Sequence, residues 1–396
     1  MEPKLDEHGT LVRGAVARLR RSGIREIMDL AASLDDVLHL EIGEPSFATP
    51  AHIVRAVERA LADGQVKYTL SRGTPALREL LAEKLRGRNG LDATPERIVV
   101  TAGGTAAVYA ALTSLVEAGD GVLVPDPGWP SFALTVELVR GRPLPYRLLP
   151  EQGYEPDLDH VEALAADASV LVVNSPSNPT GAVLAQPTLE RLLEIAQRHG
   201  LAVLSDEVYE DIVFDMEHVS VGSLGDAERV VTVFSFSKGY AMSGWRVGYA
   251  LAPGEVAEAM VKVQEAMLAS PSWTGQKAAE AALTGSQKPM REMCDVYRRR
   301  RDVAVAALRE DGLLIGVPRG TFYTMASVGA LGVDTYDAAR RLLLEERVAV
   351  APGETFGAAG AGTVRLSLAS STPVIVEAIR RISHAVQGAE GVSGAL

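Results

Sequence analysis

Lys238 lies among residues whose types suit an anionic cofactor that carries an aldehyde. It follows the apolar run 229–234, which we expect to be a buried strand because the run is β-branched and too short for a helix. Ser235 and Ser237 flank the lysine, and Arg246 lies eight residues beyond it. A lysine amine forms an imine with an aldehyde, while hydroxyls and a planar guanidinium bind phosphate. Taken alone, the pattern fits a covalent cofactor site and an exposed loop lysine equally well, and further motifs favour the cofactor site.

A pair of glycines follows another expected strand, 97–101. Gly103, Gly104 and Thr105 precede an apolar helical segment, 106–112. Glycines that open a helix expose backbone N–H groups to an anion at the positive end of the helix dipole. A tight strand-to-helix turn without a ligand is the alternative, and this motif by itself does not exclude it.

Polar residues also end two further expected strands, 170–173 and 201–205. The first is followed by the loop 174–181, where prolines close two Asn-containing turns and can hold Asn178 in a fixed orientation. The second is followed by Asp206, whose charge is costly at the end of a buried strand unless a cation or a donor meets it. Ligands of open α/β sheets bind beyond the carboxyl ends of the strands. We therefore expect these residues to share one site with the lysine.

The composition is that of an ordinary globular enzyme, with 47% hydrophobic and 23% charged residues in a chain of 396. A formal net charge of −12 argues against a nucleic-acid or anionic-membrane partner, which a basic surface would favour. Cys294 is the only cysteine, which excludes an intramolecular disulfide and a cysteine cluster that binds a metal. Residues 1–13 do not resemble a signal peptide, and no apolar stretch reaches the ~20 residues that span a bilayer. We therefore expect a cytoplasmic protein without a membrane partner.

Short apolar runs alternate with helical segments along most of the chain, which predicts an α/β fold with a mainly parallel sheet covered on both faces by helices. The runs that we expect to be strands are 97–101, 122–125, 170–173, 201–205, 230–234 and 247–251. Thr49-Pro50 and Thr74-Pro75 each place a capping hydroxyl before a proline, and both predict the start of a helix.

The pattern changes from about Lys288 onward and predicts a second, smaller α+β domain. Its expected elements are a charged helix, two strands and a final helix, at 297–308, 321–326, 364–368 and 373–386. We expect residues before Ser46 to complete this domain. The tail, 387–396, is rich in Gly, Ser and Ala, and we expect it to be loosely ordered.

Together these motifs resemble those of the class I/II aminotransferases, the aspartate aminotransferase-like enzymes of fold type I that use pyridoxal 5′-phosphate. The resemblance extends from the segment 40–45 to the segment 363–367. It implies a large domain, 47–288, whose mainly parallel seven-stranded sheet carries the cofactor. It also implies a smaller α+β domain that is formed from both termini, 1–46 and 289–396, and closes over the substrate.

The resemblance assigns roles to the polar residues at the strand ends. Lys238 would hold the cofactor as an imine and, once displaced, would move a proton between the substrate's α-carbon and the cofactor's aldehyde carbon. Asp206 would pair with the pyridine nitrogen and keep it protonated. Asn178 and Tyr209 would donate hydrogen bonds to the phenolic oxygen. Trp129 would stack on the ring, although a core tryptophan is the alternative.

The same resemblance accounts for the cofactor's phosphate. It assigns the phosphate to backbone amides, hydroxyls and a guanidinium, those of Gly103, Gly104, Thr105, Ser235, Ser237 and Arg246. Tyr68 matches a tyrosine that this family lends to the phosphate site of the neighbouring subunit. The resemblance therefore implies a homodimer with shared active sites.

Substrate binding is implied for three residues. Arg365 matches the arginine that binds the substrate's α-carboxylate, since a guanidinium presents two parallel donors and stays charged. An ordinary sheet-edge arginine is the alternative. Asn178 would assist, and Gly43 would lie at the substrate's edge, where a side chain would collide with the ligand. The implied substrates are an α-amino acid and a 2-oxo acid.

The choice of substrate is less well defined by the sequence. Dicarboxylate-specific relatives place an arginine in the segment 263–268, or a lysine at the position of Thr105, against the distal carboxylate. This chain has Glu265 and Thr105 there, so we do not expect strict aspartate specificity. Glu265 either favours a cationic side chain or is a solvated helix residue. Trp273 either narrows the pocket or packs the subunit interface.

Two kinds of chemistry remain open on this scaffold. One is an aminotransferase that works by a ping-pong mechanism, and the alternative is a pyridoxal-phosphate-dependent lyase, decarboxylase or synthase on the same fold. The combination of Asp206, Asn178, Arg365 and Tyr68 favours transamination. A cofactor-binding regulatory protein is disfavoured, because the stretch before Glu41 is short and not basic overall. None of the motifs predicts a metal site.

Overall fold

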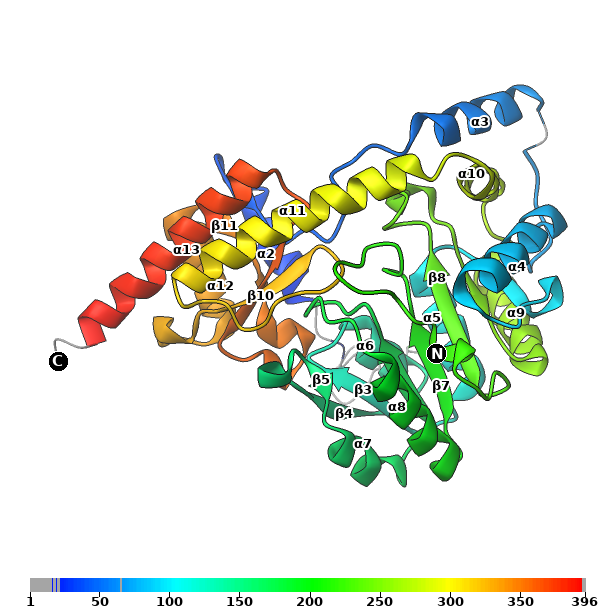
Figure 1. The fold of residues 1–396 in the computed structure, drawn as a ribbon, viewed down its shortest axis with the longest axis horizontal. Helices are drawn as coiled ribbons and strands as arrows, with labels where there is room; N and C mark the ends of the chain where they lie inside the picture. Colours follow the sequence, from blue (N-terminus) through cyan, green and yellow to red (C-terminus); the bar gives the residue numbers. More distant parts are fainter. Residues whose placement is uncertain (1–15, 17–18, 20–21, 65, 394–396) are drawn as a thin grey trace, which may run out of the picture.

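The computed structural model describes residues 16, 19, 22–64 and 66–393. A large sheet with helices on both faces makes up the middle of the chain, and the C-terminal elements form a second group beside it (Figure 1). The long helix α11, Lys288–Glu310, runs between the two groups (yellow in Figure 1). The expectations for residues 394–396, and for most of the segment before Ser22, lie outside the described residues.

The large sheet contains eight strands in the order β2-β9-β8-β7-β6-β3-β4-β5. Their bounds are β2 Ile98–Thr101, β3 Gly121–Asp126, β4 Arg142–Leu149, β5 Glu155–Pro156, β6 Val170–Asn174, β7 Ala202–Asp206, β8 Val230–Ser235 and β9 Gly248–Leu251. Strands β8, β7, β6, β3 and β4 are parallel, whereas β9 and β5 run antiparallel to their neighbours. The predicted α/β class and the mainly parallel sheet are therefore confirmed.

The sheet has eight strands where seven were expected. Each apolar run that was expected to be a strand forms one, with ends that differ by one residue at most. Strand β4 was not expected from the sequence, because it is partly exposed and contains Pro143, Pro145 and Arg147, so it is no apolar run. Strand β5 has only two residues, which is too short for any periodicity.

Helices cover both faces of the sheet, because alternate strand residues point to opposite faces. Val170 and Val172 pack with α5, α6 and α9, whereas Leu171 and Val173 pack with α7 and α8. Nearer to β2, helices α3, α4 and α10 cover the second face. The bounds are α3 Ala51–Ala62, α4 Pro75–Asn89, α5 Gly104–Leu115, α6 Ser131–Leu138, α7 Leu158–Ala165, α8 Gln186–His199, α9 Gly254–Leu268 and α10 Trp273–Thr284.

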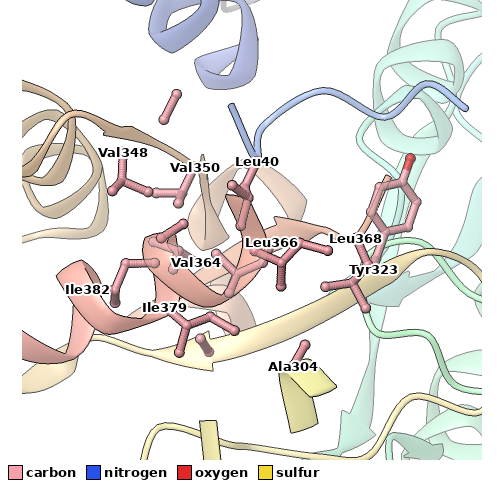
Figure 2. Close-up of a cluster of buried hydrophobic side chains, with 14 of the residues drawn as sticks. Leu40, Ala304, Tyr323, Val348, Val350, Val364, Leu366, Leu368, Ile379 and Ile382 are labelled. Atoms are coloured by element: carbon pink, nitrogen blue, oxygen red, sulfur yellow. The ribbon is translucent and has the colours of Figure 1, made fainter. Parts of the chain in front are cut away.

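The second group of elements combines the two ends of the chain. Strands β10, β13 and β12 form an antiparallel sheet, and β1 from the N-terminal segment pairs in parallel with β11. Leu40 joins Leu366 and Ile379 in one apolar core (Figure 2). The bounds are β1 Leu38–His39, β10 Tyr323–Ser327, β11 Val348–Ala349, β12 Ala351–Pro352, β13 Thr363–Ser367, α2 Gly23–Ala31, α12 Thr335–Glu346 and α13 Thr372–Ser393. The domain boundaries near residues 46 and 288 remain predictions.

One local expectation fails. Thr74 caps α4 as expected, since its hydroxyl accepts from Leu77 N, but Thr49 does not cap α3. Its Oγ1 donates instead to the carbonyl of Ala241 at 2.7 Å, because this distant strand-exit loop packs against it. Helix α13 extends through part of the tail, to residue 393, and the loose ordering of the tail stays a prediction.

Short 3₁₀ helices connect several of these elements. They are η1 Pro95–Arg97, η2 Pro150–Gln152, η3 Val221–Ser223, η4 Ser243–Trp245, η5 Gly329–Leu331, η6 Gly353–Phe356 and η7 Ala358–Gly360. Within the described ranges, no helix combines the length and the apolar character that a membrane crossing needs.

Candidate functional site

A cavity of about 570 Å³ lies at the carboxyl ends of β6, β7 and β8, where the C-terminal elements meet the sheet. Most of the residues that the sequence singles out line it, as the general rule for open α/β sheets predicts. They are Gly43, Gly104, Thr105, Trp129, Asn178, Asp206, Tyr209, Ser235, Ser237, Lys238, Arg246 and Arg365.

Lys238 lies three residues beyond the end of β8 and points across the cavity toward the N-terminal segment. Its Nζ donates to the carbonyl of Gly43 at 2.6 Å. The same nitrogen lies 5.6 Å from the centre of the Tyr209 ring and 5.7 Å from that of Phe322. Aromatic faces on this side shield the amine from bulk water, and no carboxylate among the described residues forms an ion pair with it. The amine is therefore available for chemistry.

The turn before α5 lies beside Arg246. Gly103 has φ +86°, which favours glycine, and a Cβ on it would lie 2.7 Å from Arg246 Nη2. Arg246 itself donates to the carbonyls of Ser243 and Ala102 at 2.8 and 3.2 Å. Ser235 Oγ donates to Ser237 Oγ at 2.9 Å beside them. A helix N-terminus, hydroxyls and a guanidinium are the groups that bind a phosphate dianion, so these residues fit the predicted ligand.

Asp206 is a buried acid at the end of β7, with only 3% of its surface exposed. Its Oδ1 accepts a hydrogen bond from Val208 N at 3.2 Å. Burial raises the pKa of Asp206 to about 7, and the charge of Glu207 adds to this increase. A cationic ligand group opposite Asp206 would return the pKa to the ionised range. The residue thus suits a protonated ring nitrogen.

Asn178 is held in the cavity by its own loop and by Arg365. Its backbone N–H donates to Asn174 Oδ1 at 3.0 Å, and Asn174 Nδ2 donates to the Asp206 carbonyl at 3.2 Å. The side-chain oxygen of Asn178 accepts from Arg365 Nη1 at 3.1 Å. The amide orientation is therefore set, which leaves the amide N–H₂ group for a ligand.

Arg365 lies on β13 and is buried, with 3% of its surface exposed. Its Nη2 donates to the Glu41 carbonyl at 2.6 Å, and Nε is buried with no hydrogen-bond partner in the described part of the chain. Two aromatic rings flank the guanidinium, those of Tyr323 at 4.2 Å and Phe356 at 5.0 Å. A buried guanidinium with an unused N–H suits a carboxylate ligand.

Three sequence-predicted residues lie elsewhere. Tyr68 is 89% exposed and does not line the cavity of its own chain. Glu265 is an exposed residue of α9, also outside the cavity lining. Trp273 begins α10, with Lys277 Nζ 6.0 Å from the centre of its ring.

The structure adds residues that sequence reasoning missed. Tyr323 begins β10 and lines the cavity, and its hydroxyl accepts a hydrogen bond from Tyr209 at 2.9 Å. Burial, together with Tyr323, raises the pKa of Tyr209 well above its usual value. Arg25, on α2, also lines the cavity. A strand was expected near Tyr323, but no signal indicated which of its faces would meet the cavity.

A larger cavity of about 710 Å³ lies between α4 and α11. It contains none of the sequence-predicted site residues. Its buried acid, Asp211, forms an ion pair with Arg88. Within the described ranges, no cluster of three or more His, Cys, Asp or Glu side chains could hold a metal ion. The smaller cavity is therefore the candidate active site.

Comparisons with known proteins show the family of the chain. The family model described as aminotransferase class I and II matches residues 35–382. The chain is 40% identical over 377 residues to an aspartate/prephenate aminotransferase of Thermus thermophilus. The alignment covers 94% of this chain and 94% of the relative. It is 38% identical over 372 residues to an aspartate aminotransferase of Pyrococcus abyssi, covering 92% of this chain and 96% of the relative.

Solved structures give the same result. A Pyrococcus protein superposes with a TM-score of 0.92 at 38% identity, covering 94% of this chain and 98% of the other. Aspartate aminotransferase from Thermus thermophilus with maleate superposes with a TM-score of 0.90 at 39% identity, covering 94% of this chain and all of the other.

Proposed function

The chain belongs to the class I and II aminotransferases, and from that premise we propose that it transfers an amino group from an α-amino acid to a 2-oxo acid by a ping-pong mechanism, with pyridoxal 5′-phosphate bound at Lys238. The observation that carries this proposal is the meeting of Lys238, Asp206 and Arg365 in one cavity. The alternative of a lyase, decarboxylase or synthase is not favoured, because the matched relatives are named as aminotransferases.

Residues of the chain would hold the cofactor at both ends. The amides of Gly103, Gly104 and Thr105, with Ser235, Ser237 and Arg246, would bind the phosphate, and Asp206 would pair with the ring nitrogen. Asn178 and Tyr209 would donate to the phenolic oxygen, and Trp129 would cover the ring face. When bound, the cofactor supplies an aldehyde for the amino group and a ring that accepts electrons from the substrate's α-carbon.

Lys238 and Arg365 would act on the substrate itself. Arg365 would hold the α-carboxylate through its unused N–H, while Asn178 fixes the plane of the guanidinium. The substrate's α-carbon then lies near Lys238 Nζ, which takes and returns its proton. Gly43 would keep this edge of the cavity open.

A spectroscopic half-reaction tests the proposal. The purified holoenzyme should be yellow, borohydride should attach the cofactor to the peptide that contains Lys238, and an amino donor should convert the cofactor to its amine form. Lys238→Ala should retain cofactor through the phosphate site but lose turnover by more than roughly 10⁴-fold. Lys288→Ala, at an exposed lysine on α11, is the matched control and should remain active. Appreciable steady-state turnover in Lys238→Ala would exclude the assignment.

Arg25 supports an acidic side chain on one of the substrates. Of the basic residues in the cavity lining, Arg25 alone has no role in the scheme above, and no side-chain partner of it is found in the described part of the chain. Relatives are named aspartate aminotransferases, and this chain has Thr105 in the position where some place a lysine. We propose that Arg25 binds the distal carboxylate of a dicarboxylic substrate.

Substitutions that separate charge from size test this role. Arg25→Gln should raise the KM for aspartate and for 2-oxoglutarate by roughly tenfold and leave the KM for alanine within about twofold, because only the acids have a distal carboxylate. For Arg25→Lys, which retains the charge, the KM values for aspartate and 2-oxoglutarate should lie between those of Arg25→Gln and those of the wild type. An equal rise for alanine would contradict the proposed role.

The exposed surface around Tyr68 supports a homodimer. Val66 is 53% exposed, Tyr68 89%, Leu70 59% and Met267 42%. The segments 66–70 and 267–270 are adjacent, since Thr69 N donates to Ser270 Oγ at 3.3 Å. An apolar face of this kind is typical of a subunit interface. We propose that a second copy covers it and that Tyr68 reaches the phosphate of the partner's cofactor.

Mixed dimers test the shared site. When Tyr68→Ala and Lys238→Ala subunits are combined, each hybrid dimer has both defects in one site and an intact second site. Some activity should therefore return. Tyr68→Phe alone should weaken cofactor retention with little change in donor preference. No recovery after proven subunit exchange would show that Tyr68 acts within its own chain.

A further inference from the structure

Tyr323 lies between two groups to which the proposed function gives separate tasks. It is 2% exposed, begins β10 and lines the cavity. Its hydroxyl accepts from the Tyr209 hydroxyl at 2.9 Å, and its ring centre lies 4.2 Å from Arg365 Cζ. Met325 is the direct partner of Arg365 across the β10–β13 pair. Tyr323 lies two residues away on the same face, so it is a diagonal neighbour of Arg365.

The N-terminal segment leaves room for this hydroxyl. A Cβ on Gly43 would collide with Tyr323 Oη, so only glycine at that position permits the contact with Tyr209. The carbonyl of Gly43 in turn accepts from Lys238 Nζ at 2.6 Å. Figure 2 shows Tyr323 at the edge of the apolar cluster, with its hydroxyl directed away from the labelled aliphatic side chains. Gly43 was expected to make room for the ligand, which stays a prediction, and in this structure it makes room for Tyr323.

The ring of Tyr323 also restricts the guanidinium of Arg365. Phe356 covers the guanidinium at 5.0 Å, in addition to the Tyr323 ring at 4.2 Å. The carbonyl of Glu41 and the amide of Asn178 hold two of its nitrogens. An aromatic ring near a buried guanidinium contributes through its quadrupole and limits rotation. Removing the ring would loosen the group that receives the substrate's carboxylate.

Either hydroxyl, that of Tyr209 or that of Tyr323, can be the donor of the hydrogen bond between them. Tyr209 donates to Tyr323 in this structure. If Tyr209 donates to the cofactor's phenolic oxygen, the O–H of Tyr323 becomes the donor to Tyr209. Hydrogen bonds in such a chain polarise one another, so Tyr209 becomes a stronger donor.

We propose that Tyr323 is a positioning residue with two separable tasks, in which its hydroxyl holds the Tyr209 hydroxyl and its ring holds the Arg365 guanidinium. The inference rests on the proposed function, because both groups have their tasks only in an aminotransferase. It predicts that loss of the hydroxyl and loss of the ring have different kinetic effects.

Tyr323→Phe removes only the hydroxyl. In the holoenzyme, the pH midpoint of the bound cofactor's absorbance change should rise by roughly half a unit. The reason is that Tyr209, as a weaker donor to the cofactor's phenolic oxygen, stabilises the unprotonated imine of Lys238 less. The kcat should fall about threefold to tenfold. The KM for the amino donor should stay within about twofold of the wild-type value, since the ring remains beside Arg365.

Tyr323→Met removes the ring but keeps most of the apolar volume. The KM for every α-amino acid donor should rise roughly tenfold, within the range expected for a lost buried cation–π contact. The pH midpoint should rise as in Tyr323→Phe, because both variants lack the hydroxyl. Tyr323→Leu repeats the measurement if the methionine variant does not fold.

Tyr297→Phe is the matched control. Tyr297 is 1% exposed and does not line the cavity. This variant should keep the wild-type pH midpoint, kcat and KM.

An unchanged pH midpoint in Tyr323→Phe would show that the hydroxyl of Tyr323 does not hold Tyr209. An unchanged KM in Tyr323→Met and Tyr323→Leu would show that the ring does not hold Arg365. These comparisons start from an active wild-type holoenzyme, whereas failure of that enzyme to transaminate would count against the proposed function.

Discussion

Asp206 and Glu207 are adjacent acids at the end of β7, yet their surroundings differ completely. Both are buried, at 3% and 0% exposure. Four groups donate to the Glu207 carboxylate, those of Ser205, Val221, His218 and Ser220, at distances from 2.6 to 3.0 Å. Asp206 has one backbone donor, Val208 N, and faces the cavity. The chain therefore supplies the partners of one acid and leaves the other to a ligand.

The ionisation of the neighbouring groups follows from this difference. Burial raises the pKa of Asp206 to about 7, because the hydrogen bond from Val208 and the charge of Lys238 only partly offset the loss of water. Burial alone would lower the pKa of His218, but its hydrogen bond to Glu207 and the charge of Glu207 raise it overall. A buried acid with a complete set of donors is a structural group, whereas a buried acid that lacks them indicates a binding site.

The two cavities differ in how their cations are paired. Beside the larger one, Lys84 and Asn89 both donate to Glu210, and Arg88 pairs with Asp211. Burial would raise the pKa of Glu210, but the charges of Lys84 and Arg88 lower it overall. In the smaller cavity, Arg365 Nε and the Asp206 carboxylate are left for a ligand.

Asp206→Ala should have the largest effect in this comparison. The kcat should fall roughly 10³-fold, because the contact with the ring nitrogen strengthens as charge develops in the transition state. Asp206→Glu should be milder, and both variants should keep the wild-type circular dichroism spectrum. Near wild-type turnover in Asp206→Ala would show that another group faces the ring nitrogen.

Glu207→Gln should affect stability rather than catalysis. The amide N–H₂ would face donors such as His218 and Ser220, so we expect the free energy of unfolding in urea to fall by about 3 kcal/mol. The kcat per folded molecule should stay within about threefold of the wild-type value. A loss of kcat as large as that of Asp206→Ala would remove the distinction between the two acids.

The stability of the cofactor-free protein should depend on pH through Asp206. Its folded pKa, about 7, lies above the usual value of a free aspartate, so the folded state binds more protons than the unfolded state between these values. Asp206 therefore lowers stability as the pH rises through this window. From pH 5 to pH 7.5, the wild type should lose roughly 2 kcal/mol relative to Asp206→Asn in urea unfolding. Parallel pH profiles for the two proteins would contradict the raised pKa.

Glu265→Gln should have the smallest effect. The residue is an exposed acid of α9 outside the cavity lining, so kcat/KM for acidic, neutral and basic donors should each change less than about twofold. A selective loss for lysine or ornithine would restore the hypothesis of a cationic substrate. It would also require this surface to reach the active site of a partner subunit.

Local sequence patterns predicted those site residues that directly follow apolar runs. Asp206 ends β7 and Lys238 lies three residues beyond β8, and the parallel order of these strands brings their ends to one edge. The same reasoning missed β4, because its exposed Pro and Arg residues interrupt the apolar pattern. It also missed Tyr323, because periodicity in a short strand indicates which residues share a face but not what that face meets.

The sequence by itself determined which chemical groups stand at the strand ends, because β-branched runs form buried strands and polar residues end them. Only the tertiary structure decided how those groups are paired. Lys238 meets Gly43 across 195 positions, and Arg365 meets Glu41 across 324. Contacts of this range depend on how the two groups of elements pack, which no local period encodes. For the same reason, the sequence could not show that Glu207 is satisfied by the chain while Asp206 faces the cavity.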